Sequence, residues 1–195
     1  MKITLKAILI GVLVGGAISF AFGMLDGFLI ARGGEPIGWA LRVGVGTSLG
    51  VVTMLLVSAL SGNKALRLAP AADDKRAKTF APDPGRGVIY VFRDAFVGKL
   101  VGLDLLVDGR PVAQTRGKTF VRLDLAPGDH TLASVHPGHD NQVDLRVSAP
   151  AGSIVYVEQS IRMGALQSGP ALALADNNKS QARIRRCRLL ASQPT

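Results

Sequence analysis

The pattern of apolar and polar positions divides this chain into two unlike parts. Two apolar runs, residues 7–25 and 43–60, fill most of the N-terminal third, and neither contains a charged residue. Each run has about the length of a helix that crosses the hydrocarbon core of a bilayer. The segment between them contains Gly33 and Pro36, which favour a turn. The pattern therefore predicts a two-helix transmembrane hairpin over residues 1–62.

Small residues recur four positions apart in both apolar runs. Gly11 and Gly15 lie in the first run, and Gly46 and Gly50 lie in the second. Lipid provides little hydrophobic drive for helix association, so close packing depends on small residues that let two backbones approach. We expect these four glycines to form the contact between the helices. The alternative is that glycine is simply frequent in membrane helices.

Two charged residues, Asp26 and Arg42, border the apolar runs on the side of the loop. We expect Arg42 to extend its side chain toward the polar loop, about one helical turn away. The alternative is an ion pair between Arg42 and Asp26 across the hairpin.

A different pattern begins after the hairpin. Residues 63–86 contain three prolines, several basic residues and no apolar periodicity, which indicates a basic linker. From residue 87 to 195, short runs rich in β-branched residues alternate with turn signals every 8 to 12 residues or so. This spacing predicts an all-β antiparallel sandwich of about seven strands, followed by a short C-terminal helix.

Two turns in this part have specific chemistry. Asp108-Gly109 separates two short apolar runs, as expected for a tight hairpin whose residues adopt positive φ. Pro127-Gly128 separates two further runs, and proline fixes φ before the chain reverses. We expect both pairs to set strand register.

The C-terminal segment, residues 176–190, has two interpretations. A helix capped by Asp176 or Asn177 is favoured, because apolar residues then share roughly one side. A strand with a bulge is the competing interpretation, because arginines alternate with apolar residues.

The charge distribution points to a membrane surface. The net charge is +9, from 23 Lys and Arg against 14 Asp and Glu, and the excess lies outside the β-rich part. Basic residues beside apolar runs are expected to contact lipid headgroups. The residues in this position are Lys2, Lys6, Lys64 and Arg67. Nucleic acid is not an expected partner, because aromatic residues do not interleave with the basic ones.

The same basic residues predict the orientation. Two spans return the chain to its starting side, so the charge count places the soluble domain in the cytoplasm of a bacterial cell, at the inner membrane. A periplasmic domain is the alternative. The first run is longer than a usual signal-peptide core, which favours an uncleaved anchor, although Ser19 and Ala21 have the spacing that a signal peptidase reads. Cys187 is the single cysteine, so it makes no internal disulfide. No cysteine lies directly after the first apolar run, where lipoprotein processing requires one.

Catalytic and metal-binding patterns are weak. The histidines and their acidic neighbours offer suitable metal ligands but lack the spacing of a known zinc site. They are His130, His136, His139, Asp129 and Asp140. Ser134 and Ser160 have no partner pattern for nucleophilic catalysis. We therefore expect no metal, no cofactor and no enzymatic activity.

The order of motifs from residue 88 to 190 resembles a bacterial family catalogued as domain of unknown function 2846. Its parts here are a Val-Ile-Tyr-Val-Phe strand followed by Arg, a Val-Asp-Gly hairpin, a Leu-x-Pro-Gly-x-His-Thr turn, a Gly-led Tyr-Val strand and a terminal arginine-rich segment at residues 182–190. The Asp-Gly and Pro-Gly elements are also similar to PEGA-type sandwich repeats. The resemblance implies an envelope protein without known activity, and it favours the periplasmic alternative because many relatives are lipoproteins.

These observations favour a membrane-anchored β-sandwich that binds or scaffolds a protein or an envelope component. A small-molecule or sugar sensor is the alternative, and an enzyme is the least favoured hypothesis. A strand-edge binder needs an uncovered, flat strand edge with few charges, whereas a small-molecule binder needs a concave apolar pocket with converging polar groups.

Overall fold

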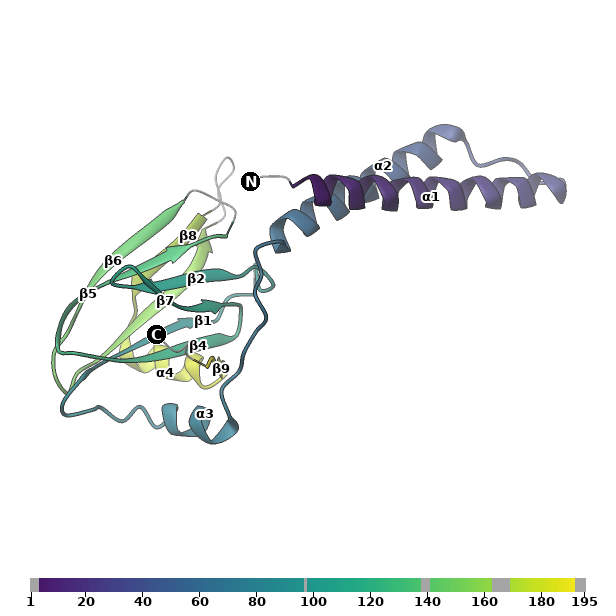
Figure 1. Cartoon of the computed structure of the whole chain (residues 1–195). Helices are drawn as coiled ribbons and strands as arrows, with labels where there is room; N and C mark the ends of the chain where they lie inside the picture. The colour runs from purple at the N-terminus through teal and green to yellow at the C-terminus, as the bar shows by residue number, and fades with distance from the viewer. Residues whose placement is uncertain (1–3, 97, 138–140, 163–168, 192–195) are drawn as a thin grey trace. The chain divides into compact units, whose positions relative to one another are not determined.

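The structure, a computed structural model, describes residues 4–96, 98–137, 141–162 and 169–191 (Figure 1). The chain forms two compact units, Met1–Ser61 and Gly62–Thr195.

The first unit contains two antiparallel helices, α1 (Leu5–Ala31) and α2 (Trp39–Leu60). Thr4 caps α1, because its hydroxyl accepts a hydrogen bond from the backbone N–H of Ala7 at 3.2 Å. Both helices are long and apolar enough to cross a membrane. Large apolar side chains are exposed on their surfaces, including Leu13 and Phe20, each 71% exposed. A helix that is apolar on all sides and not buried in protein suits a lipid environment.

The second unit contains two sheets and two short helices. Its elements are α3 (Ala71–Ala77), β1 (Gly87–Arg93), β2 (Leu103–Val107), β3 (Arg110–Thr115), β4 (Thr119–Leu125), β5 (Gly128–Val135), β6 (Gln142–Ala149), β7 (Ile154–Arg162), β8 (Gly169–Leu174), α4 (Asn177–Ile184) and β9 (Arg188–Leu189). One sheet has the order β8-β7-β1-β4-β9 and the other β3-β2-β5-β6. The predicted fold class, two apolar helices followed by a β-sandwich with a short C-terminal helix, is confirmed. The described residues form nine strands instead of about seven.

Two strand pairs depart from the expected antiparallel arrangement. β1 pairs in parallel with β7, with Tyr90 opposite Tyr156, and β4 pairs in parallel with β9. Turn signals predict only the direction of strands joined by a hairpin. β7 and β9 reach their partners after long excursions of the chain, so no local signal sets their direction.

β1 lies at the centre of its sheet, and all seven of its residues are buried. One face packs against the other sheet, where Ile89 and Val91 join a core with Leu105, Leu132 and Val157. Burial on both faces explains why this strand is a continuous apolar run rather than an alternating one.

A buried polar bridge joins the two sheets inside this core. The side-chain carbonyl of Gln159 on β7 accepts a hydrogen bond from the hydroxyl of Thr115 at 2.5 Å. The amide of Gln159 donates to the hydroxyl of Ser134 at 2.6 Å. All three side chains are fully buried and mutually satisfied, so the bridge fixes the alignment of the sheets.

The outer face of the five-stranded sheet carries a second core of aromatic residues. Tyr90 stacks on Tyr156 at 5.5 Å between ring centroids, and Phe80 lies 5.4 Å from Tyr90. α3 and α4 contribute Ala77 and Ile184 to this cluster, and Figure 1 shows both helices beside the five-stranded sheet. Cys187 is buried in the same cluster, where burial raises the pKa of its thiol to about 11. The cysteine is therefore an uncharged packing group at neutral pH.

The segment expected to be a linker belongs to the second unit and packs against its sheet. Phe80 contributes a ring to the aromatic cluster, and the buried Asp74 accepts a hydrogen bond from the N–H of Leu189 at 2.7 Å. Asp74 also pairs with Lys78 at 2.7 Å. The helix α3 is short and buries few apolar positions, so it produces no visible periodicity in the sequence.

The C-terminal segment combines both predicted interpretations. Asp176 caps α4 by accepting a hydrogen bond from the N–H of Lys179 at 3.2 Å. After α4 ends at Ile184, the chain continues as the short strand β9 beside β4.

Candidate functional site

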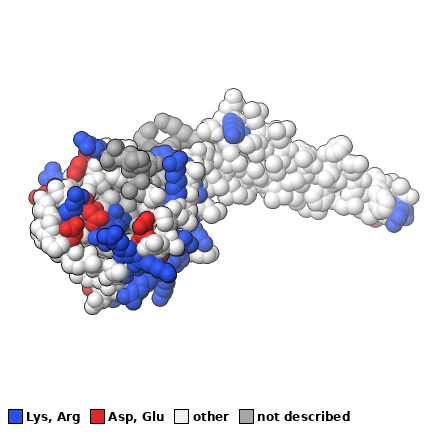
Figure 2. All heavy atoms as spheres, turned by 60° about the horizontal axis from the view of Figure 1, so that its bottom comes forward, with Lys and Arg blue, Asp and Glu red and all other residues white. Residues whose placement is uncertain are grey.

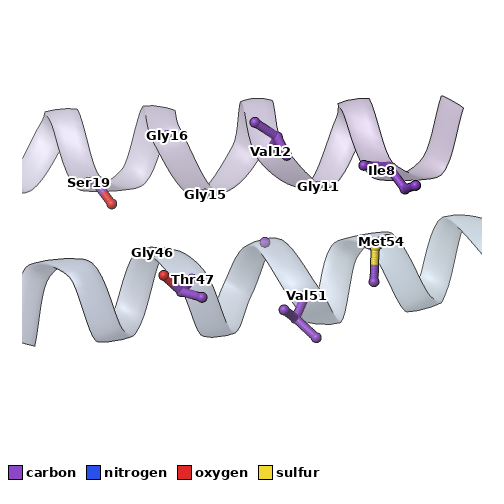
Figure 3. A pocket seen from close by; sticks show the side chains of 11 residues that line it. Ile8, Gly11, Val12, Gly15, Gly16, Ser19, Gly46, Thr47, Val51 and Met54 are labelled. Atoms are coloured by element: carbon purple, nitrogen blue, oxygen red, sulfur yellow. The ribbon is translucent and has the colours of Figure 1, made fainter. Parts of the chain in front are cut away.

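The four predicted glycines lie together at the contact between α1 and α2, and Gly11, Gly15 and Gly46 are labelled there in Figure 3. A Cβ atom on Gly11 would lie 2.7 Å from the carbonyl oxygen of Gly50, and one on Gly15 would lie 2.8 Å from that of Gly46. Real Cβ atoms do not approach so closely, so larger residues would push the backbones apart. Gly16, Gly27 and Gly44, in the same helices, face open space.

An apolar pocket of about 370 Å³ lies along this contact, between α1 and α2. Its walls include Ile8, Val12, Val51 and Met54 (Figure 3). A small-molecule site would require several converging polar groups, and the polar side chains that line this pocket are Ser19 and Thr47.

An ion pair crosses the hairpin near its loop. Arg42 lies 2.6 Å from one carboxylate oxygen of Asp26, and the other oxygen accepts a hydrogen bond from the N–H of Ile37 at 2.5 Å. Asp26 is buried. The structure thus has the paired arrangement rather than an Arg42 directed only toward the loop, and the pair ties α1 to the start of α2.

The residues predicted to contact lipid headgroups lie in different settings. Lys2 falls outside the described residues, and Lys6 is exposed on α1. The Lys64 ammonium lies 3.1 Å from the carboxylate of Asp104, so this side chain is engaged by the β-sandwich. Arg67 is exposed.

The Asp108-Gly109 turn has the predicted hairpin geometry. Asp108 has φ +48° and Gly109 has φ +79°, and together they join β2 directly to β3. The carboxylate of Asp108 also reaches β5, where it accepts a hydrogen bond from the N–H of Thr131 at 2.8 Å. In the second predicted turn, Gly128 has φ +145° and begins β5 after Pro127.

His130 is held between two acceptors. Its Nδ1 lies 2.7 Å from Asp108 and its Nε2 lies 2.8 Å from the carbonyl oxygen of Ala126. The backbone contact with Ala126, together with Asp108, raises the pKa of His130. The hydrogen bonds from His130 and Thr131 lower the pKa of Asp108. Both contacts are satisfied when the imidazole is doubly protonated, so the pair fastens the turns at one end of the sheet.

In the part of the chain that the structure describes, the remaining candidates for chemistry do not assemble a centre. Among the described residues, no group of three or more His, Cys, Asp or Glu side chains could hold a metal ion. His139 and Asp140 lie outside the described residues. Ser134 is buried and bonded to Gln159, and the Nδ1 of His136 lies 2.8 Å from the carbonyl oxygen of Pro137.

Arg93, the arginine at the end of the Val-Ile-Tyr-Val-Phe motif, is fully buried. Its guanidinium donates to the carbonyl oxygens of Val101 at 2.6 Å and Gly98 at 2.7 Å. Burial lowers its pKa to about 10. Arg93 therefore holds the connection between β1 and β2. Its position in the motif marks it, but the sequence does not reveal that its partners are backbone carbonyls.

A groove of about 540 Å³ lies between α3, β4 and β9. Its charged residues are Asp73, Arg76, Asp83, Arg122 and Asp124. Arg122 and Asp124 pair with each other at 2.9 Å instead of converging on an open centre.

β6 is the longest strand with an open edge among the described residues. It pairs with β5 along all eight residues, from Gln142 to Ala149, and no described strand pairs with its other side. Its exposed side chains are Gln142, Asp144, Arg146 and Ser148. The other end strands are shorter, and Leu68 bridges to Leu190 beside β9.

Comparison with known proteins matches residues 83–171 to the family described as "Protein of unknown function (DUF2846)". The chain is also similar to a protein of Haemophilus influenzae described as "Uncharacterized protein". The two are 22% identical over 134 residues, which are 68% of this chain and 79% of the relative. No solved structure matches the chain.

The matched span begins before β1 and ends within β8. It includes Asp108-Gly109, Pro127-Gly128 and the Gly-led Tyr-Val strand, but it does not include α4, β9 or the terminal segment at residues 182–190 that the predicted resemblance also covered. The likeness to PEGA-type repeats stays a prediction. The resemblance to the family of unknown function 2846 is confirmed, with residues 83–171 as the part of the chain that matches it.

Proposed function

We propose that this chain is a non-enzymatic protein of the bacterial inner membrane that binds another protein or an envelope component. The helical hairpin anchors it, and the β6 edge of the sandwich receives an extended segment of the partner. The observation that carries this proposal is that β6 pairs with β5 along all eight of its residues, while no described strand pairs with its other side.

An extended segment that adds to a sheet edge gains main-chain hydrogen bonds, and alternate side chains determine which segment fits. β6 supports this mode because its alternate side chains face outward and only two of them, Asp144 and Arg146, are charged. Natural proteins usually protect an open edge with lysine, proline or bulges. β6 contains no lysine and no proline, and no bulge interrupts its register with β5.

The test is co-purification of the full chain from membranes in detergent. Gln142→Lys/Ser148→Lys places two lysines on the β6 edge, where they oppose the approach of another strand. Ser160→Lys adds a lysine to β7, which lies between two strands. We expect the edge variant to lose its partner and the β7 variant to retain it. A partner that still co-purifies with the edge variant would contradict binding at β6.

A further inference from the structure

Two segments that are distant in the sequence meet on one side of the β-sandwich. The N–H of Ala69 donates to the carbonyl of Leu189 at 3.0 Å, and the N–H of Ala191 donates to the carbonyl of Arg67 at 3.0 Å. The Asp74 carboxylate adds a bond to the N–H of Leu189. The segments before β1 and after β8 are therefore fastened together along β9.

Both segments carry the positive charge of this unit. Residues 62–86 contain six Lys and Arg against three Asp, and residues 176–195 contain five against one. Residues 87–175, by contrast, contain eight basic and eight acidic residues. Figure 2 shows Lys and Arg side chains gathered on the side of α3 and α4, with Asp and Glu side chains among them.

The surplus charge on this side points outward. The more deeply placed acidic groups already have basic partners: Asp74 pairs with Lys78, and Asp94 pairs with Lys118 and Arg183. Seven exposed basic residues have no ion pair among the described residues, and we call them the cationic face. They are Arg67, Lys75, Arg76, Lys179, Arg185, Arg186 and Arg188. Asp73 and Asp176 are the exposed acids closest to them in sequence, and they leave the face positive.

We infer that the cationic face binds the anionic headgroups of a lipid bilayer. Leu66 and Leu68 flank Arg67 and are 39% and 42% exposed, and apolar residues beside basic ones are typical of segments that lie at a membrane interface. The chain from Leu60 to Arg67 spans at most about 25 Å even when fully extended. If α2 spans a membrane, that tether keeps headgroups at a high effective concentration near the face.

A nucleic acid would fit this face less well. Single-stranded nucleic acid is held by exposed aromatic rings on which bases stack. The rings on this side, Phe80, Tyr90, Phe120 and Tyr156, are all buried beneath α3 and α4. The inference uses a different side of the domain from the β6 edge and does not depend on the partner proposed there.

The experiment uses the full chain in nanodiscs of phosphatidylcholine, mixed with sedimentable vesicles. The vesicles contain either phosphatidylcholine alone or about one third phosphatidylglycerol. Lys75→Glu/Arg76→Glu reverses charge in one segment and Arg185→Glu/Arg186→Glu reverses charge in the other. The control, Arg110→Glu/Arg162→Glu, makes the same change in net charge at exposed arginines outside both the face and the β6 edge. Unchanged melting temperatures establish that each variant is folded.

We expect the native chain to sediment with the anionic vesicles, to stay in solution with the neutral ones, and to detach at 1 M salt or so, where the Debye length is about 3 Å. Each double reversal on the face should weaken vesicle binding about tenfold or more, because each basic side chain contributes roughly fivefold. The control should bind within about twofold of the native chain. Equal binding to neutral vesicles, or an equal loss in the control, would overturn the inference. Binding of polyglutamate without binding of anionic vesicles would overturn it in favour of an acidic protein partner.

Discussion

At the scale of single residues, Asp108 contributes both a turn and a contact between strands. Asp-Gly predicts the hairpin because these residues accept the positive φ that such a turn needs. The contact with His130 is different. It requires β2 to pair with β5, where Val107 lies opposite Leu132. No local signal in the sequence specifies that pairing, so the sequence does not predict that His130 contacts Asp108.

This pair predicts a pH-dependent stability. Folding raises the pKa of His130 above its ordinary value of 6.5, so its contribution is present below that value and is lost as pH rises through the raised pKa. Folding lowers the pKa of Asp108, so its contribution is present above 3.8 and is lost as pH falls through the lowered value. Between these limits both groups stabilise the fold.

We therefore expect His130→Gln to lower the melting temperature most near pH 5, by an amount equivalent to about 1 kcal/mol or less, because Asp108 is half exposed. The difference from the native chain should shrink as the pH rises above about 7. A pH series of thermal melts measures it. A difference that is constant from acid to alkaline pH would show that the imidazole contributes packing rather than charge.

At the scale of elements, the helical hairpin shows which parts of a helix contact can be predicted from the spacing of small residues. The four-residue spacing marks Gly11, Gly15, Gly46 and Gly50, and the structure places all four at the helix contact. Gly16 and Gly44 are equally small and lie in the same helices, yet they face open space. Spacing predicts a face of small residues, but only the packed helices show which glycines cannot be replaced.

This distinction gives a prediction with an internal control. Gly15→Leu/Gly50→Leu should force α1 and α2 apart and destabilise the hairpin by about 1 kcal/mol or more. Gly16→Leu/Gly44→Leu makes the same substitution at two glycines that face open space, and it should leave the stability of the hairpin nearly unchanged. Thermal unfolding of the full chain in detergent compares the two variants. Equal melting temperatures would mean that these glycines reflect ordinary membrane composition.

Elements of the second unit differ in how well the sequence predicts them. Strands joined by tight turns, such as β2 and β3, follow from their turn residues. The parallel neighbours β7 and β9 do not, because long stretches of chain separate them from their partners. α3 also escapes prediction, since residues distant in the sequence hold it: the N–H of Leu189 donates to Asp74, and the hydroxyl of Tyr90 donates to the carbonyl oxygen of Ala77.

At the scale of the whole molecule, the account rests on a membrane anchor followed by a folded domain. Composition predicts both parts, since the apolar runs and the turn-rich region differ sharply. It does not predict that the basic segments on either side of the sandwich meet along β9. Nor do the matched family and the relative, both without a described activity, supply a partner.

The most direct test of the account is a pair of reporter fusions in bacterial cells. Because α1 and α2 are proposed to cross the inner membrane as a hairpin, alkaline phosphatase placed after Gly34 should reach the periplasm and be active. The same enzyme placed after Thr195 should be inactive, because Lys and Arg near the N-terminus and after α2 favour the cytoplasmic side. Activity at Thr195 would contradict the proposed orientation, and inactivity at both positions would contradict the membrane hairpin itself.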